Sequence, residues 1–335
     1  NYSIVVKHTE DEISAINSAI GAAYAGVRAM TATSGGGFSL MTEAWGMAGM
    51  VEVPLVVVEA MRTGPSTGMP TWTGQADLKF VLAASQGEFP RFVLAPGDVE
   101  QCFYLTQEAF NLAEEYQTPV AIITDKHIAE CFQWFEPPDL DKVKLGRGKV
   151  LTEPELAKIN DYKRYLYTES GVSPRALPGT KGGEHVANSD EHNEKGFSEE
   201  GSAERVKMMD KRFRKIETAR LEIPEPLLEG DKNADITLIA WGSTRGSILE
   251  AMKELRKQGK KVNYLQIVYI SPFPTEKVKQ VFKKAKKVAI VENNKTGQLV
   301  GWLKEQTGLD PDYKILKYDG RPFFPDELVT TIKEI

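Results

Sequence analysis

Three short loops of this 335-residue sequence carry side chains that could bind or activate a ligand, and each follows an apolar run. Residues 33–37 are Thr-Ser-Gly-Gly-Gly, and residues 62–71 are Arg-Thr-Gly-Pro-Ser-Thr-Gly-Met-Pro-Thr. Residues 125–127 bring Asp, Lys and His together. Ligands of open parallel sheets bind beyond the carboxyl ends of the strands, so these loops are the expected borders of a site.

The first loop offers backbone as well as side chains. Gly35 and the two glycines after it have no Cβ, so a ligand can approach the chain closely. A helix beginning after Ser39 would direct its N-terminal amides at an anion, with Thr33 and Ser34 nearby. The spacing matches neither the P-loop nor the dinucleotide fingerprint, so a plain tight turn is the alternative to a ligand contact.

The second loop begins with an arginine. The Arg62 guanidinium offers two parallel donors to a carboxylate or phosphate, and a surface arginine without a ligand is the equal alternative. Residues 64–68 also fit the pattern G-x-S-x-G, which would make Ser66 the nucleophile of a serine hydrolase. That motif needs a helix directly behind the serine, and Pro70 would remove one of its hydrogen bonds. A serine hydrolase therefore stays only as an alternative function.

Two further polar segments have structural explanations. Thr9 and Glu12 have the spacing of a capping box, with Thr9 as the N-cap and Glu12 as the third helical residue. Residues 190–193, Asp-Glu-His-Asn, are interpreted as a solvated polar turn, with a ligand contact as the alternative. No metal site is expected, because metal-ligand spacing is missing among the four histidines, which are His8, His127, His185 and His192.

Composition excludes several classes of partner. Lys and Arg number 42 and Asp and Glu 47, a net charge of −5, so no overall positive field attracts nucleic acid or an anionic membrane. No apolar run reaches the ~18 residues of a membrane span. Cys102 and Cys131 cannot supply the four thiolates of an iron–sulfur cluster, so any such centre must lie on another chain. Two cysteines also fit a reducing compartment, the cytoplasm.

The elements that must position these residues follow from the apolar pattern. Residues 2–125 alternate short apolar runs with helical patterns, which predicts a parallel sheet covered on both faces. One helix is expected over residues 10–26, and another follows Asp98, whose side chain can cap it while Gln101 reaches back. Strands are expected at residues 4–7, 28–33, 54–60, 92–95 and 119–125.

The rest of the chain divides into two parts. Residues 151–232 are rich in charge, Pro and Gly and are interpreted as a polar linker or excursion with one helix over residues 198–220. Residues 233–335 resume the alternation and form a second, smaller domain after the first domain, residues 1–150. The predicted fold class is α/β, with two doubly wound parallel-sheet domains. The second domain is expected to have strands at 236–241, 262–268, 288–292 and 314–318, helices at 247–257, 275–285 and 298–307, and Gly259 as a helix C-terminal cap.

Four segments together match one known family. They are Glu12 with Gly21 and the alanine after it, residues 31–35, residues 62–71, and residues 116–120, Tyr-Gln-Thr-Pro-Val. In these residues the sequence resembles the alpha subunit of 2-oxoacid:ferredoxin oxidoreductases, most of all the 2-oxoglutarate type. Residues 188–193 and 268–274 extend the resemblance over nearly the whole chain. It implies a first domain like the pyrimidine-binding domain of thiamine diphosphate enzymes and a second like the transketolase C-terminal domain.

The resemblance also implies roles for individual residues. Family members have a glutamate at the position of Glu12, where it hydrogen-bonds the aminopyrimidine ring of thiamine diphosphate, so Glu12 is implied to be catalytic and cofactor-binding. Arg62 matches the arginine that holds the carboxylate of the 2-oxoacid. Ser66 and Thr67 border the same pocket as substrate-binding residues. The other residues implied to contact the cofactor are Thr33, Ser34 and Gly35.

The implied reaction is oxidative decarboxylation of a 2-oxoacid, with 2-oxoglutarate favoured, to acyl-coenzyme A with reduction of ferredoxin. Thiamine diphosphate and Mg²⁺ would be held mainly by a beta subunit that also carries an iron–sulfur cluster. Family alpha chains have a first strand with the segment Tyr-Pro-Ile-Thr-Pro, and this sequence begins after that point. We therefore expect an upstream gamma-like segment or another polypeptide to cover the sheet edge. The alternative is a non-catalytic assembly or binding subunit, because fold alone does not imply function.

Overall fold

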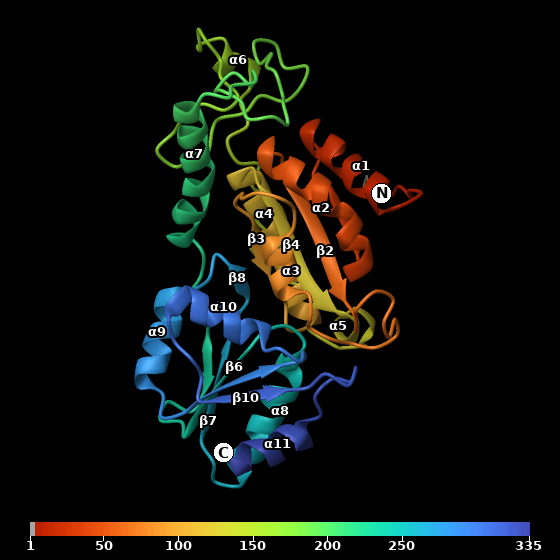
Figure 1. The fold of residues 1–335 in the computed structure, drawn as a ribbon, viewed down its shortest axis with the longest axis vertical. Helices are drawn as coiled ribbons and strands as arrows, with labels where there is room; N and C mark the ends of the chain where they lie inside the picture. Colours follow the sequence, from red (N-terminus) through yellow and green to blue (C-terminus); the bar gives the residue numbers. More distant parts are fainter. Residues whose placement is uncertain (1–3) are drawn as a thin grey trace.

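Two five-stranded sheets organise the chain, which a computed structural model describes for residues 4–335. The first sheet has the strand order β1-β2-β4-β3-β8 and the second β10-β9-β6-β7-β5. In Figure 1 the first sheet lies above the second, and β2 points toward the second sheet. Neighbouring strands are parallel except β3–β8 and β5–β7, which are antiparallel. The expected α/β class with two parallel-sheet domains is confirmed, and each sheet is mostly parallel with one antiparallel pair.

The first sheet is built from buried apolar runs. β2 (Leu55–Met61) and β4 (Pro119–Asp125) are parallel neighbours along their whole length. Successive side chains face opposite sides, so Val57 packs in the core on one face and Val56 in the core on the other. Helices cover both faces, which explains why the strands are almost continuously apolar. The remaining strands are β1 (Met30–Thr33), β3 (Phe92–Leu94) and β8 (Tyr269–Ser271).

The helices of this unit lie on both faces of the sheet. α1 (Glu12–Tyr24) and α2 (Gly35–Met50) pack against each other in one core, and α4 (Val99–Tyr116) packs in the core on the opposite face. α4 begins at Asp98 as expected, because the Asp98 carboxylate accepts a hydrogen bond from the Gln101 amide at 2.8 Å. Two shorter helices complete the unit, α3 (Leu78–Ala83) and α5 (Lys126–Glu130).

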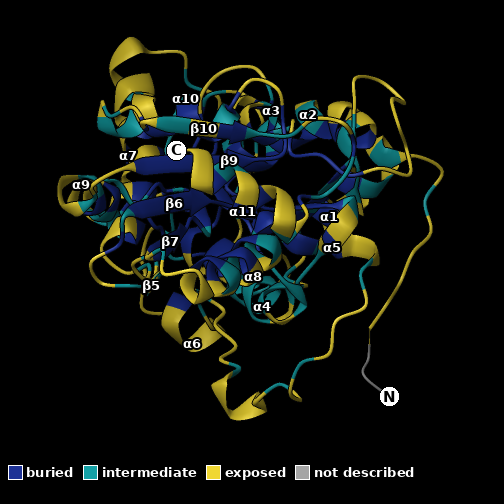
Figure 2. Ribbon diagram, turned by 90° about the horizontal axis from the view of Figure 1, so that it is seen from below, coloured by how far each residue is buried: buried dark blue, intermediate teal, exposed yellow. Residues whose placement is uncertain are grey.

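The second sheet has the same layered construction. α8 and α11 pack on one face, while the core on the other face contains residues of α9 and α10 and continues into the core of the first unit. Figure 2 shows the inner strands β6, β7 and β9 of this sheet as buried and the outer sides of the helices as exposed. The strands are β5 (Leu228–Gly230), β6 (Ile236–Ala240), β7 (Val262–Gln266), β9 (Val288–Glu292) and β10 (Tyr313–Leu316). The helices are α8 (Thr244–Lys257), α9 (Thr275–Lys284), α10 (Gln298–Thr307) and α11 (Pro325–Glu334).

Most of residues 151–232 pack over the end of the first sheet at which β2 begins, whereas β5, near the end of this range, belongs to the second sheet. α7 (Ser202–Arg220) carries Lys211 and Lys215, and each ammonium group lies 2.6 Å from the Glu52 carboxylate, just before β2. All three side chains are buried. Desolvation opposes ionisation of Glu52, but attraction to the two ammonium groups outweighs this effect and holds the pKa of Glu52 well below the usual range. The short helix α6 (Glu153–Leu156) also lies in this region. The 3₁₀ helix η1 (Leu140–Lys142) precedes the region in the chain.

The polar segment 190–193 belongs to this packed region, and its interpretation as a solvated turn is wrong. His192 is fully buried, with its ring centroid 4.1 Å from that of Tyr165. Glu191 forms ion pairs with Arg205 and Arg212. Its partners come from α7, so sequence around the turn gives no sign of them.

Several local expectations are also corrected. Residues 4–7 form no strand and are exposed, which leaves β1 at the edge of the sheet with every residue exposed or half-buried. α2 begins at Gly35 rather than after Ser39, so the glycines are its first turn. β5, β8 and α11 were not expected, and β8 places part of residues 233–335 in the first sheet. Within residues 4–335, none of the helices combines the length and apolarity needed to span a bilayer.

Candidate functional site

The carboxyl ends of strands in both sheets meet across residues 62–77. Gln75, fully buried in this segment, donates from Nε2 to the Trp241 carbonyl at 2.9 Å, just after β6. Its Oε1 accepts from the Asn293 amide at 2.9 Å, just after β9. Asn294 Nδ2 also donates to the Gln75 carbonyl at 2.8 Å. The segment that follows β2 is therefore fixed between the sheets, at the edge where a site is expected.

Glu12 takes no part in the N-terminal capping box of α1 that the sequence predicts. Asp11, rather than Thr9, is the N-cap of α1, since the Asp11 carboxylate accepts from the Ser14 amide at 2.7 Å. Glu12 is therefore the first helical residue and not the third. The expected capping box is wrong, because the carboxylate of Asp11 has taken the position of the cap.

The Glu12 and Thr33 side chains converge on Gly37 in the first turn of α2. A Cβ added to Gly37 would lie 2.0 Å from Thr33 Oγ1 and 2.7 Å from Glu12 Oε1, so only glycine fits between them. Ser34 is the N-cap of α2, and its side chain makes no capping hydrogen bond. The first turn of α2 thus presents backbone amides beside a carboxylate and two hydroxyl groups.

A second cluster consists of Glu59 and Asp77, which flank the same turn of α2, and Arg62, whose charge acts on both acids. A Cβ added to Gly35 would lie 2.7 Å from Asp77 Oδ2 and 3.5 Å from Glu59 Oε1. Glu59 is 0% exposed in β2, while Arg62 is half-buried just after the strand. Within residues 4–335, neither Glu59 oxygen nor Arg62 Nε has a hydrogen-bond partner.

Burial sets the charge of this cluster. Desolvation raises the pKa of Glu59 to about 9, and the charge of Asp77 adds to that effect while the charge of Arg62 opposes it. Desolvation also raises the pKa of Asp77, again against Arg62. Glu59 is therefore protonated at neutral pH, and its carboxyl does not neutralise the guanidinium. A half-buried arginine beside a neutral carboxyl is suited to binding a carboxylate.

Ser66 and Thr67 form the exposed tip of the second loop. Thr63 and Met69 pair at its base, where the Met69 amide donates to the Thr63 carbonyl at 2.8 Å. The next helix, α3, does not start directly behind Ser66, so the strand–turn–helix elbow of a serine hydrolase is missing there. The structure contradicts the serine hydrolase alternative.

The third loop borders the same edge of the first sheet. Asp125 is buried at the end of β4, where its carboxylate accepts from the Ile128 amide at 3.2 Å and caps α5. The His127 amide donates to Thr73 Oγ1 at 3.3 Å, which ties this loop to the second one. A cavity of about 250 Å³ beside the two loops is lined in part by Trp72 and His127.

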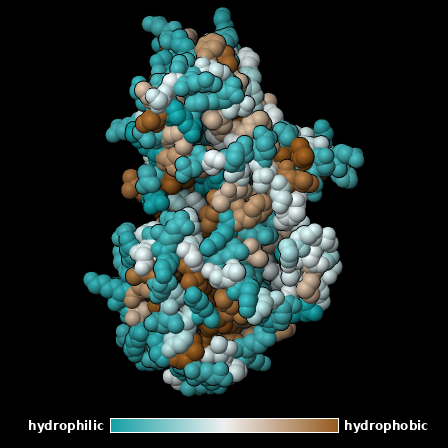
Figure 3. Space-filling view, viewed as in Figure 1, coloured by the Kyte–Doolittle hydropathy of each residue, from teal (hydrophilic) through white to brown (hydrophobic). Residues whose placement is uncertain are grey.

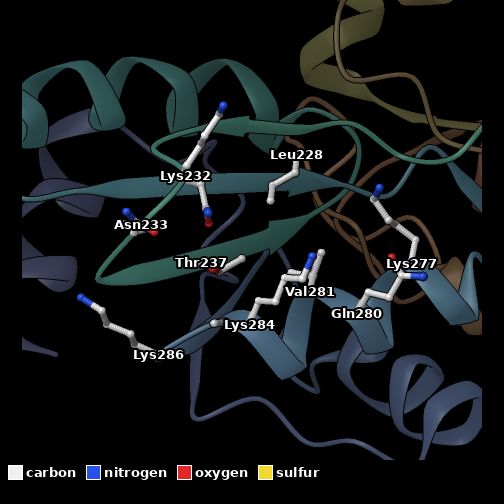
Figure 4. A pocket seen from close by; sticks show the side chains of 12 residues that line it. Leu228, Lys232, Asn233, Thr237, Lys277, Gln280, Val281, Lys284 and Lys286 are labelled. Carbon is white, nitrogen blue, oxygen red and sulfur yellow. The ribbon is translucent and has the colours of Figure 1, made fainter.

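A larger cavity, of about 430 Å³, lies away from this edge (Figure 4). It is bordered by Thr237 and Asn263, near the starts of β6 and β7, and by Lys232, Lys277 and Lys284 among others. None of the residues expected to do chemistry line it. Size alone therefore does not locate the site.

Two members of the site escaped the sequence-based expectations, Glu59 and Asp77. A signal for Glu59 existed: it is the single charged residue in the apolar run that became β2. A lone acidic residue in a strand covered on both faces is costly to bury unless it is neutral or paired. Asp77 gave no comparable signal, because it lies in a loop whose burial depends on the second sheet.

Comparison with known proteins finds two matching family models and several similar proteins. Residues 1–211 match the family described as pyruvate flavodoxin/ferredoxin oxidoreductase, thiamine diphosphate-binding, and residues 234–318 match pyruvate:ferredoxin oxidoreductase core domain II. The 2-oxoacid:ferredoxin oxidoreductase subunit alpha of Saccharolobus solfataricus is 44% identical over 99% of this chain and 53% of its own length. The 2-oxoglutarate synthase subunit KorA of Methanothermobacter marburgensis is 33% identical over 96% of this chain and 84% of its own length. The chain spans about half the length of several of the curated relatives it matches.

Solved structures extend the likeness to three dimensions. The 2-oxoglutarate:ferredoxin oxidoreductase from Magnetococcus marinus, solved with 2-oxoglutarate, coenzyme A and succinyl-CoA bound, matches with a TM-score of 0.92 and 37% identity. The match covers 98% of this chain and 56% of that chain. A split-gene transketolase matches with a TM-score of 0.52 and 13% identity over 96% of this chain and 80% of its own, which shows a shared fold alone.

Proposed function

Because the chain belongs to the family of 2-oxoacid:ferredoxin oxidoreductase alpha subunits, we propose that it serves an enzyme that oxidatively decarboxylates a 2-oxoacid to acyl-coenzyme A and reduces ferredoxin. The observation that carries the proposal is the convergence of Glu12 and Thr33 on Gly37, with Glu59 and Asp77 against Gly35 of the same helix turn and the charge of Arg62 acting on both acids. The KorA relatives and the Magnetococcus marinus enzyme favour 2-oxoglutarate as the substrate.

Thiamine diphosphate fits this corner, since Gly37 lets the Glu12 carboxylate and the Thr33 hydroxyl lie directly against the first turn of α2, where polar groups of a ligand can be bound. When bound, the cofactor supplies the nucleophilic carbon that attacks the keto group, and it accepts the electron pair that stays behind when carbon dioxide leaves. Glu12 would bind and orient its aminopyrimidine ring and hold a proton at Oε1. The other residues that would hold the cofactor are Thr33, Ser34 and Gly35.

Arg62 would bind the carboxylate of the 2-oxoacid. Its guanidinium is half-buried at the end of β2, where a neutral Glu59 leaves the charge available. Ser66 and Thr67 lie on the exposed tip of the same loop and would border the substrate once a partner covers it. In this arrangement the substrate keto group would lie between Arg62 and the Glu12 corner.

A partner subunit is part of the proposal. Exposed apolar side chains gather near the start of α1, where Figure 3 shows a hydrophobic group, and they include Ile4, Val5, Val6 and Ile13. Among the residues that the structure describes, the adjacent strand β1 pairs only with β2, so its other edge is open to a further strand. We propose that a beta subunit carrying the diphosphate of the cofactor, Mg²⁺ and an iron–sulfur cluster docks here in the cytoplasm, and that an upstream gamma-like segment or another polypeptide pairs with β1. Ferredoxin would receive the electrons from the cluster.

We also propose a division of the chain into two domains and a polar region between them. Residues 1–150 would form the pyrimidine-binding unit, residues 233–335 the transketolase-like unit, and residues 151–232 the polar region that packs on the first. The Glu52 pairs with Lys211 and Lys215 join that region to the first sheet at the end remote from the site.

The test is to purify the chain together with its beta subunit and to measure viologen reduction. We expect reduction that requires both 2-oxoglutarate and coenzyme A, with pyruvate as the comparison substrate. The isolated chain should show none. If a complex that holds thiamine diphosphate and the cluster reduces no viologen with any 2-oxoacid, the chain is the non-catalytic assembly subunit instead.

A further inference from the structure

Glu59 is a buried carboxyl without a hydrogen-bond partner in the part of the chain that the structure describes. It is 0% exposed, and among residues 4–335 neither of its oxygens makes a hydrogen bond. In the sheet it lies opposite Thr33 on β1 and Ile123 on β4, and neither neighbour is charged. A buried acid in such surroundings is stable only if it is neutral or if a nearby charge compensates it.

The charges that face Glu59 come from two segments. Asp77, the N-cap of α3, lies with Glu59 against Gly35, and Arg62 follows three residues after Glu59 in the chain. The first turn of α2 contains no acidic residue and contributes only the partial positive charge of its amides. Lys79 on α3 extends away to Gly301 on α10, where a Cβ would meet its Nζ at 2.6 Å.

The number of protons on the two acids decides the charge beside Arg62. With both acids ionised, the three side chains carry a net charge of −1, which would repel an anionic 2-oxoacid. With one proton the net charge is zero, and with two it is +1. Desolvation and mutual repulsion of a buried and a half-buried acid favour retention of at least one proton, and the burial of Glu59, with its raised pKa, identifies it as the holder.

We propose that Glu59 is a positioning residue that carries a proton in the working enzyme and thereby keeps the Arg62 guanidinium available for the carboxylate of the substrate. This inference rests on the proposed function. Loss of the proton would place a second negative charge beside Arg62, so substrate binding weakens while the chemical step at Glu12 does not change. Glu59 acts through Arg62 and, being buried, does not itself touch the substrate.

The first test detects the proton without relying on activity. Infrared spectra of the complex are compared between the parent and Glu59→Gln, with Glu43→Gln on the exposed face of α2 as the matched control. At neutral pH the parent-minus-Glu59→Gln difference should contain the carbonyl band of a protonated carboxylic acid, and the band should disappear as the pH is raised past about 9. The Glu43→Gln difference should contain only carboxylate bands. A carboxylate-only difference for Glu59→Gln would overturn the proposal.

The second test uses the pH dependence of KM for 2-oxoglutarate in the viologen assay. In the parent, KM should rise at least ~10-fold across the ionisation of Glu59, the loss expected when a charge-assisted hydrogen bond is compromised. Glu59→Gln should lose the alkaline rise, because the amide that replaces the carboxyl cannot ionise. Asp77→Asn removes the charge that helps to retain the proton, so the rise should move to lower pH.

These outcomes separate the two proposals. A parent complex without 2-oxoacid activity refutes the proposed function, and the infrared band still reports on the proton. An active parent whose alkaline rise in KM persists unchanged in Glu59→Gln refutes the role of Glu59 alone. If Glu59→Gln fails to fold, Asp77→Asn tests the proposal instead. The alkaline rise in KM should then occur at lower pH than in the parent, and a rise at the same or at a higher pH would count against the proposal.

Discussion

Replacement of Gly37 by alanine perturbs the contact on which the site is built. The added Cβ would lie 2.0 Å from Thr33 Oγ1 and 2.7 Å from Glu12 Oε1, so α2 or both side chains must move. Overpacking of this kind costs about 1–3 kcal/mol. Alanine also favours the helix by up to about 1 kcal/mol over glycine, which offsets part of that cost.

A matched control separates the two contributions. Gly246 lies exposed in α8, and a Cβ there would meet nothing within 4 Å. Gly246→Ala gains the same helix propensity without the clash, so Gly37→Ala should be the less stable of the two by about 1–3 kcal/mol. Urea unfolding of the two variants of the isolated chain measures this difference directly.

Turnover of the complex provides the second readout. If Glu12 is displaced by the added methyl group, kcat should fall by ~10²- to 10⁴-fold, as for loss of a proton-transfer group. Gly246→Ala should have the turnover of the parent. Equal stability and equal turnover for the two variants would refute the packing of Glu12 and Thr33 against α2.

Substitutions at three further residues test other parts of the site and of the fold. Glu12→Gln preserves the size of the side chain and should lower kcat by ~10²- to 10⁴-fold in steady-state viologen assays; near-normal turnover would leave Glu12 a structural role only. Arg62→Ala should lower kcat/KM for the 2-oxoacid by ~10- to 100-fold. Arg62→Lys should recover little, because an ammonium lacks two parallel donors, and a parent-like lysine variant would exclude the bidentate contact. Glu52→Gln should destabilise the chain to urea by about 3–5 kcal/mol, since Lys211 and Lys215 would remain buried without their partner. Because the pKa of Glu52 is depressed, its contribution to the free energy of unfolding is complete at neutral pH and declines as the pH falls below about 4.3, the pKa of an unfolded glutamate. If the difference in free energy of unfolding between the parent and Glu52→Gln does not change with pH down to acid unfolding, that assignment is contradicted.

Elements buried on both faces were the most predictable from sequence. β4 matches its expected bounds, residues 119–125, because every position is apolar or ends the run, and neither face leaves an exposed residue to blur the pattern. The cap at Asp98 was also correct, since capping depends on residues only three positions apart. Gln101 does not reach back to Asp98 as expected: its Oε1 accepts from the Gly97 amide at 2.7 Å, and its Nε2 donates to Gln266 in β7 at 2.9 Å.

The features that the sequence could not reveal depend on contacts between distant segments. β8 is a three-residue strand whose partner, β3, lies more than 170 residues earlier in the chain, as with Ser271 opposite Val93. His192 is buried only because α7 and Tyr165 cover it. Likewise, the raised pKa of Glu59 depends first on its burial and then on the charge of Asp77, which lies two residues after Gln75 in the segment bonded to the second sheet. Local pattern therefore located the loops of the site but not the charge state within it.

The central claim is that this chain brings Glu12 to the pyrimidine ring and Arg62 to the substrate carboxylate. A structure of the complex with the beta subunit, thiamine diphosphate and 2-oxoglutarate measures both contacts. The account predicts a Glu12 carboxylate oxygen and an Arg62 guanidinium nitrogen each within hydrogen-bond distance, about 2.7–3.2 Å, of the respective ligand atoms. Cofactor bound at a site that Glu12 does not approach, or a substrate carboxylate held by residues other than Arg62, would contradict it.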